Sequence, residues 1–253
     1  MQIVFALVAL VVGFVLLVKG ADWFVEGSAG IANKFGIPQI VIGLTIVAMG
    51  TSMPEAAVSI SAALRGSAEI TIGNVVGSNI MNILVILGLT AVVCQIAVQK
   101  TTIHYEIPMV IGVTILLAVM GLQNNIISRA EGVILLACMV VYMLYLLRLA
   151  KRGVVENEEM DAYANQVSFG RLILLVVVGV AAIIFGSHVA VEAASAIARI
   201  FGISERFIGL TIVAFGTSLP ELVTSVAAAR RGNSDIAVGN IVGSNLFNIM
   251  FVV

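Results

Sequence analysis

The sequence predicts an all-α, polytopic membrane protein, and three observations support that fold class. Of 253 residues, 60% are hydrophobic and only 11% are charged, whereas a soluble protein has about 25% charged residues. The mean hydropathy is +1.14, and the apolar residues form runs of helix length. So little polar surface cannot cover a globule in water, which argues against a soluble enzyme, a disordered chain or a nucleic-acid-binding domain.

Eight apolar runs are candidate membrane spans, because a hydrocarbon core about 30 Å thick needs roughly 20 apolar residues per helix. In chain order they cover residues 3–20, 37–64, 70–98, 107–122, 126–148, 170–199, 206–230 and 236–253. The first run lacks the basic flank and cleavage site of a signal peptide, so we interpret it as a retained span. The last run stops at Val253 without a polar flank, from which we expect a C-terminally truncated chain.

Polar residues between the runs indicate the orientation. Asp22, Trp23 and Glu26 follow the first run and are interpreted as an interfacial anchor at its end. One long acidic segment, residues 151–168, separates the fifth run from the sixth. Loops on its side of the membrane carry roughly eight Lys and Arg, against roughly four on the other side, and the excess marks the cytoplasmic side. We therefore expect a cytoplasmic acidic linker at 151–168 and an N-terminus outside.

An internal repeat is the strongest signal in the chain. Residues 43–82 align with residues 209–248 at an offset of 166 (221 − 55), and about 24 of the 40 aligned positions are identical. Five runs separate a position in one copy from its mate in the other, so the copies enter the membrane from opposite sides. Inverted repeats of this kind form substrate sites at the bilayer midplane. We expect a first repeat at 1–150 and a second, inverted and truncated repeat at 169–253, both derived from a ten-helix parent.

Two carboxylates, Glu55 and Glu221, lie deep inside apolar runs at equivalent positions of the two copies. An intramembrane carboxylate costs at least a few kcal/mol, so it needs a partner. No Lys or Arg lies mid-span to neutralise either one. A cation from solution is the natural partner, and the alternative is a protonated carboxyl group with a structural role.

Each glutamate ends the motif Gly-Thr-Ser-x-Pro-Glu. Proline removes a backbone amide and clashes with the carbonyl group four residues earlier, so the motif predicts a broken helix with free carbonyl oxygens. In the first copy these carbonyls lie near Gly50 and Thr51, with Ala48 one turn further back. The motif also supplies hydroxyl groups, from Thr51, Ser52, Thr217 and Ser218. Hydrogen bonding between helices is the alternative role for these hydroxyls.

A second motif, Gly-Asn-x-Val-Gly-Ser-Asn-x-x-Asn, follows in each copy. Its Ser and last Asn are four residues apart and therefore share a helix face; they are Ser78 with Asn82 and Ser244 with Asn248. Ca²⁺ takes six to eight oxygen ligands, and the two motifs together offer carboxylate, hydroxyl, amide and carbonyl oxygens. They predict a cation site. The other asparagines of the motif can serve either the site or the packing of helices, namely Asn74, Asn79, Asn240 and Asn245.

These two motifs, each present twice, resemble the alpha-repeats of the sodium/calcium exchanger family in its prokaryotic branch. The resemblance implies a ten-helix Na⁺/Ca²⁺ antiporter of the plasma or inner membrane that works by alternating access, with the ions as substrates and no cofactor or enzymatic activity. It implies ligands at Glu55, Glu221, Thr51, Ser52, Thr217, Ser218, Ser78, Ser244, Asn82 and Asn248, and at the backbone of Ala48 and Ala214. Several prokaryotic and potassium-dependent relatives carry Asp at the position of Asn248, where this chain resembles potassium-independent animal exchangers.

Charge balance supports exchange separately from the resemblance. Two carboxylates balance one Ca²⁺ or two Na⁺, so these ions compete for the same charge. An empty site would hold two unpaired carboxylates in low dielectric, which disfavours movement of the unloaded protein. The alternatives are H⁺/Ca²⁺ exchange at the same glutamates, a cation channel and a membrane scaffold without transport. The sequence indicates the lipid bilayer as surroundings, and neither a nucleic acid nor an obligate protein partner.

Overall fold

The computed structural model describes residues 2–65, 68–124, 127–151 and 167–253, and in these ranges the chain is helical, without strands. The first half contains α1 (Gln2–Lys34), α2 (Gln39–Ile42), η1 (Gly43–Val47), α3 (Ala48–Thr51), α4 (Met53–Leu64), α5 (Ala68–Met81), η2 (Asn82–Ile86), α6 (Leu87–Val93), η3 (Thr102–Glu106), α7 (Ile107–Asn124) and α8 (Arg129–Ala150). The second half contains α10 (Phe169–Ile200), α11 (Glu205–Ile208), η4 (Gly209–Val213), α12 (Ala214–Thr217), α13 (Leu219–Arg230), α14 (Ser234–Phe247) and η5 (Asn248–Val252). The η segments are single π-helical turns that continue into the neighbouring helices.

The eight predicted runs correspond to the helices observed. Among the described residues, six helices are long and apolar enough to cross a membrane, and two bent helix pairs raise the number to as many as eight. The bent pairs are 39–51 with 53–64, at 49°, and 211–217 with 219–230, at 50°. Both bends lie just before the prolines of the first motif, so the predicted helix breaks are confirmed. Most of the acidic segment 151–168 lies outside the described residues.

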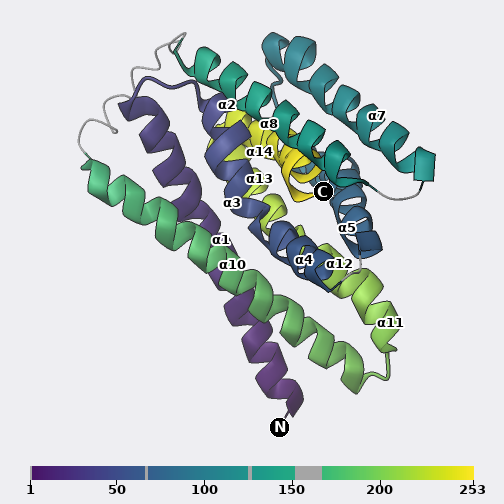
Figure 1. Cartoon of the computed structure of the whole chain (residues 1–253). Helices are drawn as coiled ribbons and strands as arrows, with labels where there is room; N and C mark the ends of the chain where they lie inside the picture. Colours follow the sequence, from purple (N-terminus) through teal and green to yellow (C-terminus); the bar gives the residue numbers. More distant parts are fainter. Residues whose placement is uncertain (1, 66–67, 125–126, 152–166) are drawn as a thin grey trace.

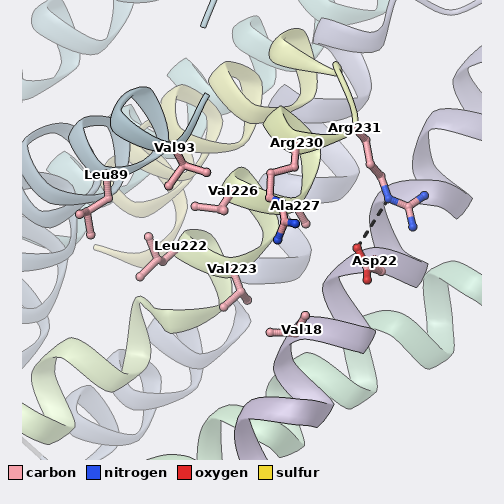
Figure 2. A pocket seen from close by; sticks show the side chains of 10 residues that line it. All are labelled: Val18, Asp22, Leu89, Val93, Leu222, Val223, Val226, Ala227, Arg230 and Arg231. Atoms are coloured by element: carbon pink, nitrogen blue, oxygen red, sulfur yellow. Dashed lines mark ion pairs between the residues drawn. The ribbon is translucent and has the colours of Figure 1, made fainter. Parts of the chain in front are cut away.

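The first helix is longer than predicted. The apolar run ends near residue 20, but α1 continues to Lys34. Asp22, Trp23 and Glu26 therefore lie within the helix, and their predicted position at its end is wrong. Their role at the membrane interface stays a prediction. The helix tolerates the two acids because Arg231 pairs with both. Its Nε lies 3.6 Å from Asp22 Oδ1 (Figure 2), and its Nη1 lies 3.4 Å from Glu26 Oε2. A tertiary contact thus stabilises polar residues that interrupt the apolar run.

The two longest helices, α1 and α10, cross on one side of the bundle (Figure 1). Their crossing is built on glycines, since a Cβ atom at Gly20 would lie 2.9 Å from the carbonyl oxygen of Gly179. A Cβ atom at Gly186 would lie 2.8 Å from the carbonyl oxygen of Gly13. Small residues allow membrane helices to approach backbone to backbone. The pair forms an apolar core with α13 through Leu17, Phe24 and other buried side chains.

Helix α14 lies at the centre of the molecule. In the span 234–252, 83% of the most apolar window is buried, against 22–28% for the other five spans. It packs against η1, α13, α3 and α2. At its C-terminal end α14 continues into η5, which α7 and α8 cover. A second apolar core forms there around Leu44, Tyr142 and Leu246. The polar residues of the second motif in the second copy are consequently buried.

Candidate cation site

The two broken helices bring both glutamates into the interior. Ser52 and Ser218 leave helical geometry, at φ −83° and ψ 8° and at φ −91° and ψ 3°, and begin α4 and α13. Proline is tolerated in the first turn of a helix, because the backbone amide that it lacks would have no partner within the helix there. Glu55 and Glu221 follow in these first turns, and their exposed fractions are 0% and 1%. The helix break thus places each carboxylate near the N-terminal, positive end of a half-helix.

Serine hydroxyls connect the carboxylate of each copy to the other copy. Ser52 Oγ donates to Glu221 Oε1 at 2.7 Å, and Ser218 Oγ donates to Glu55 Oε1 at 3.4 Å. These four residues are exact mates at the repeat offset. Ser78 Oγ also donates to Glu55 Oε1, at 3.5 Å. The structure therefore brings the two glutamates and their predicted neighbours together, and each carboxylate accepts a hydrogen bond from a serine of the other copy.

Four buried oxygens in these motifs have no hydrogen-bond partner in the described part of the chain. They are Glu55 Oε2, Glu221 Oε2, Asn82 Oδ1 and Asn248 Oδ1. An unsatisfied buried acceptor costs about 1–3 kcal/mol, and more when it is charged. These oxygens form two pairs of repeat mates, so their lack of partners has a common cause. Hard cations bind acceptor oxygens of this kind, and no Lys or Arg forms an ion pair with either glutamate within the described ranges.

Four of the five remaining predicted ligands lie on the broken helices, and the fifth, Ser244, lies on α14. The carbonyl oxygen of Ala48 accepts from Thr51 Oγ1 at 3.3 Å and from Ser244 Oγ at 3.4 Å. Thr51 Oγ1 is also 2.9 Å from Asn240 Oδ1. In the second copy, Thr217 Oγ1 donates to the carbonyl oxygen of Ala214 at 3.2 Å. All of these groups therefore border the broken helices, but Ala48 is buried whereas Ala214 is exposed.

A pocket borders the site between α5 and the second broken helix. It has a volume of about 420 Å³ and is lined by Gly73, Asn74, Gly77, Ser78, Met81, Thr211, Ala214 and Phe215. Ser78 joins the pocket to the carboxylate of Glu55 through its hydrogen bond. At the equivalent place in the other copy the helices are in contact, because a Cβ atom at Gly243 would lie 2.8 Å from the backbone of Leu44. A Cβ atom at its mate, Gly77, meets nothing within 4 Å.

Two asparagines that the sequence left open support the glutamate turns. Asn74 Nδ2 donates to the backbone oxygen of Glu55 at 3.1 Å and to Ser59 Oγ at 2.9 Å. Asn240 Nδ2 makes the same pair of bonds in the second copy, to the backbone oxygen of Glu221 at 3.3 Å and to Ser225 Oγ at 2.9 Å. Both serines follow their glutamate by four residues on the same helix face, a spacing that could have indicated them from the sequence.

One further buried carboxylate was missed by the sequence analysis. Glu106 is the last residue of η3, directly before α7, and its exposed fraction is 0%. The hydroxyl of Tyr145 on α8 donates to it. Its position near the end of an apolar run resembles that of a solvated interfacial acid. The partner on α8 is far away in the sequence, so no local signal distinguishes Glu106 from such a residue.

The described residues form a helical bundle with up to eight candidate spans, and two broken helices bring buried oxygens together with two carboxylates in its interior. This arrangement is typical of multi-pass membrane transporters of cations. The family model described as sodium/calcium exchanger protein matches residues 5–148 and 171–253. The chain therefore belongs to the sodium/calcium exchanger family and is a cation/Ca²⁺ exchanger rather than an enzyme. The predicted fold class and family are confirmed.

Individual relatives cover nearly the whole chain. The putative antiporter CaxA of Alkalimonas amylolytica is 41% identical over 98% of this chain and 78% of its own length. The inner membrane protein YrbG of Escherichia coli is 38% identical over 96% of this chain and 76% of its own length. The solved structure of the sodium-calcium exchanger NCX_Mj, soaked with Na⁺ and Sr²⁺, is 34% identical, with a TM-score of 0.86 over 99% of this chain and 81% of that one.

Proposed function

We propose that the protein is a Na⁺/Ca²⁺ antiporter that binds the two ions in turn between Glu55 and Glu221, near the middle of the membrane. The observation that carries this proposal is the set of four unpartnered buried oxygens, two from each copy. Hard cations bind such oxygens, and the two carboxylates match the charge of one Ca²⁺ or two Na⁺. The relative NCX_Mj, described as a sodium-calcium exchanger, supports Na⁺ as the driving ion.

The other predicted ligands complete the coordination shell in this proposal. The hydroxyls of Thr51, Ser52, Thr217, Ser218, Ser78 and Ser244 keep a lone pair for a cation while they donate to carboxylate or carbonyl oxygens. Asn82 and Asn248 supply amide oxygens, and Ala48 and Ala214 supply backbone carbonyls next to the helix breaks. Broken helices in transporters present such unwound or terminal carbonyls to Na⁺.

Alternating access follows from the difference between the two copies. The pocket beside Gly77 is open, and the equivalent interface beside Gly243 is closed. If these two interfaces exchange their states, the site opens to the other side of the membrane. We propose that residues 1–150 and 169–253 are the two inverted repeats, and that the segment 151–168 is cytoplasmic and the N-terminus outside. The inner-membrane relative YrbG supports a prokaryotic plasma membrane.

The test is uptake of radioactive Ca²⁺ into vesicles that contain the protein and are loaded with Na⁺, then diluted into Na⁺-free buffer. We expect uptake that requires internal Na⁺ and is lost in both Glu55→Gln and Glu221→Gln. Glu205→Gln is the matched control, because Glu205 is exposed and pairs with Arg199 outside the site. Uptake driven by a pH gradient alone would replace this proposal with H⁺/Ca²⁺ exchange, and flux that needs no counter-ion would indicate a channel.

A further inference from the structure

The second motif forms a reciprocal set of amide hydrogen bonds between the two copies. Asn82 Nδ2 donates to Asn245 Oδ1 at 2.9 Å, and Asn248 Nδ2 donates to Asn79 Oδ1 at 3.1 Å. Asn79 and Asn245 are repeat mates, as are Asn82 and Asn248, so the two bonds are equivalent under the repeat symmetry. Each proposed amide ligand is thus held by an asparagine of the opposite copy.

The direction of these bonds decides which end of each amide is left for an ion. An asparagine amide has an accepting oxygen and a donating NH₂ group of nearly the same shape. A cation attracts the oxygen and repels the NH₂ group. In both pairs the NH₂ group is taken up by the opposite copy, and the oxygens Asn82 Oδ1 and Asn248 Oδ1 remain buried without a partner. A flipped amide would present NH₂ to the cation and oppose two acceptor oxygens to each other.

The orientation of one pair starts from a group that cannot flip. Asn79 Nδ2 donates to the backbone oxygen of Asn245 at 3.2 Å. Since a backbone carbonyl only accepts, this bond fixes which end of the Asn79 amide is the oxygen, and that oxygen faces Asn248. Asn248 therefore places its NH₂ group against Asn79 Oδ1, and its own oxygen, Oδ1, stays free. Asn245 lies on α14, the most enclosed helix, and is 1% exposed. The packing of α14 fixes its position.

We infer that Asn79 and Asn245 are positioning residues, which hold the amides of Asn248 and Asn82 with their oxygens available to the transported cation. This inference rests on the proposed function, because it assumes that a cation binds these oxygens. It gives a role in ion selection to two residues that do not themselves present an unpartnered oxygen. It also predicts that each copy sets the ligand geometry of the other, so the two halves of the site cannot be tuned separately.

The matched variants are Asn245→Leu, which removes the acceptor at similar volume, and Asn245→Asp, which keeps an acceptor oxygen. Binding of radioactive Ca²⁺ to the purified protein and the Ca²⁺-dependent rise in its Tm are measured together with exchange. We expect Asn245→Leu to weaken Ca²⁺ binding about tenfold, the effect of losing one directed hydrogen bond, and Asn245→Asp to restore it. In exchange, we expect a higher KM for Ca²⁺ and a largely unchanged kcat.

A double-mutant cycle separates positioning from simple helix packing. In a protein that already carries Asn82→Ala, the change Asn245→Leu should weaken Ca²⁺ binding no further, because the amide that it orients is gone. Additive losses, or a fall in the Tm of the ion-free protein with unchanged Ca²⁺ affinity, would show that Asn245 only joins the helices. If Asn245→Leu does not fold, Asn79→Leu in the wild-type and Asn248→Ala backgrounds tests the other pair in the same way.

The outcome for this inference is distinguishable from that of the proposed function. If Asn82→Ala and Asn248→Ala both bind Ca²⁺ as the wild type does while Glu55→Gln does not, the positioning role is wrong and the glutamate site stands. If neither glutamate variant changes binding, the proposed site itself is wrong.

Discussion

The broken helix of the first copy packs against α14, whereas that of the second copy borders an open pocket. The sequences of the two segments are nearly identical, GLTIVAMGTSMPE and GLTIVAFGTSLPE. Val47 and Ala48 are buried, while their mates Val213 and Ala214 are exposed. The first segment packs on α14, with Gly43 against Gly239, and the second segment has no such contact with α5 at Gly73. Since the local sequence is the same, the same residues are compatible with both a closed and an open interface.

The long helices show the same difference. Helix α1 packs along α13, and Arg231 pairs there with Asp22 beside an apolar pocket of about 510 Å³ (Figure 2). Arg231 also pairs with Glu26. The mates of Arg231 and Glu26 are Arg65 and Glu192, and neither forms an ion pair in the part of the chain that the structure describes. Helices α10 and α4 barely touch. The two interfaces thus differ together, as expected if one motion exchanges both.

The largest effect is expected from alanine at the paired glycines Gly243 and Gly77. A Cβ atom at Gly243 would lie 2.7 Å from the Cβ atom of Ala48, so Gly243→Ala overpacks the closed interface and should destabilise the protein by about 1–3 kcal/mol. Gly77→Ala meets open space and should leave the Tm unchanged. If the interfaces exchange their states, however, Gly77→Ala should slow Na⁺/Ca²⁺ exchange while ion binding persists.

Thermal unfolding and exchange, measured on both glycine variants, decide this prediction. Gly73→Ala is a second variant on the open side, and its behaviour should follow that of Gly77→Ala. Full exchange activity in both open-side variants would mean that this interface never closes as its mate does. The comparison between the copies would then describe a fixed asymmetry rather than two states of one transporter.

A smaller effect is expected at the serine pair. Ser52 donates to Glu221 at 2.7 Å, whereas Ser218 donates to Glu55 at 3.4 Å, a long and weak hydrogen bond. A hydrogen bond to a charged group contributes about 1.5–3 kcal/mol, so Ser52→Ala should weaken Ca²⁺ binding about tenfold and Ser218→Ala less. Ca²⁺ binding to both variants at equal ionic strength measures the difference. Equal losses would indicate that the copies contribute symmetrically once an ion is bound.

Local signals in the sequence predicted the spans, the repeat and the helix breaks. Proline and glycine act within one helical turn, so the break before Glu55 depends on its neighbours alone. The extent of α1 could not be predicted in this way, because Asp22 is tolerated through a contact with Arg231, which is distant in the sequence. The burial of Glu106 depends likewise on Tyr145 of another helix.

The asymmetry of the site could not be predicted from the sequence, for a different reason. Two copies with about 24 identities in 40 positions predict two equivalent environments. The structure assigns them different environments because α14 is enclosed by other helices, whereas α5 borders the pocket. The candidate ligands were therefore predictable as pairs, and the accessible side of the candidate site was not.

The smallest effect is expected at the arginine pair. Arg231 is partly exposed, as are Asp22 and Glu26, and exposed ion pairs contribute about 0–1 kcal/mol. Arg231→Gln should therefore change the Tm little, but it weakens the closed α1–α13 interface and should shift the balance between the two states by up to about fivefold, in the direction that opens this side. Labelling of a cysteine introduced at Val226, in the pocket beside Arg231, measures that opening.

Arg65→Gln is the control, because it breaks no ion pair here. It should leave the labelling rate unchanged or lower it, because its effect falls on the state in which the α10–α4 side is closed. A rise of the labelling rate in Arg65→Gln equal to that in Arg231→Gln would show that the two arginines act through surface charge alone, and high salt should then abolish both effects alike.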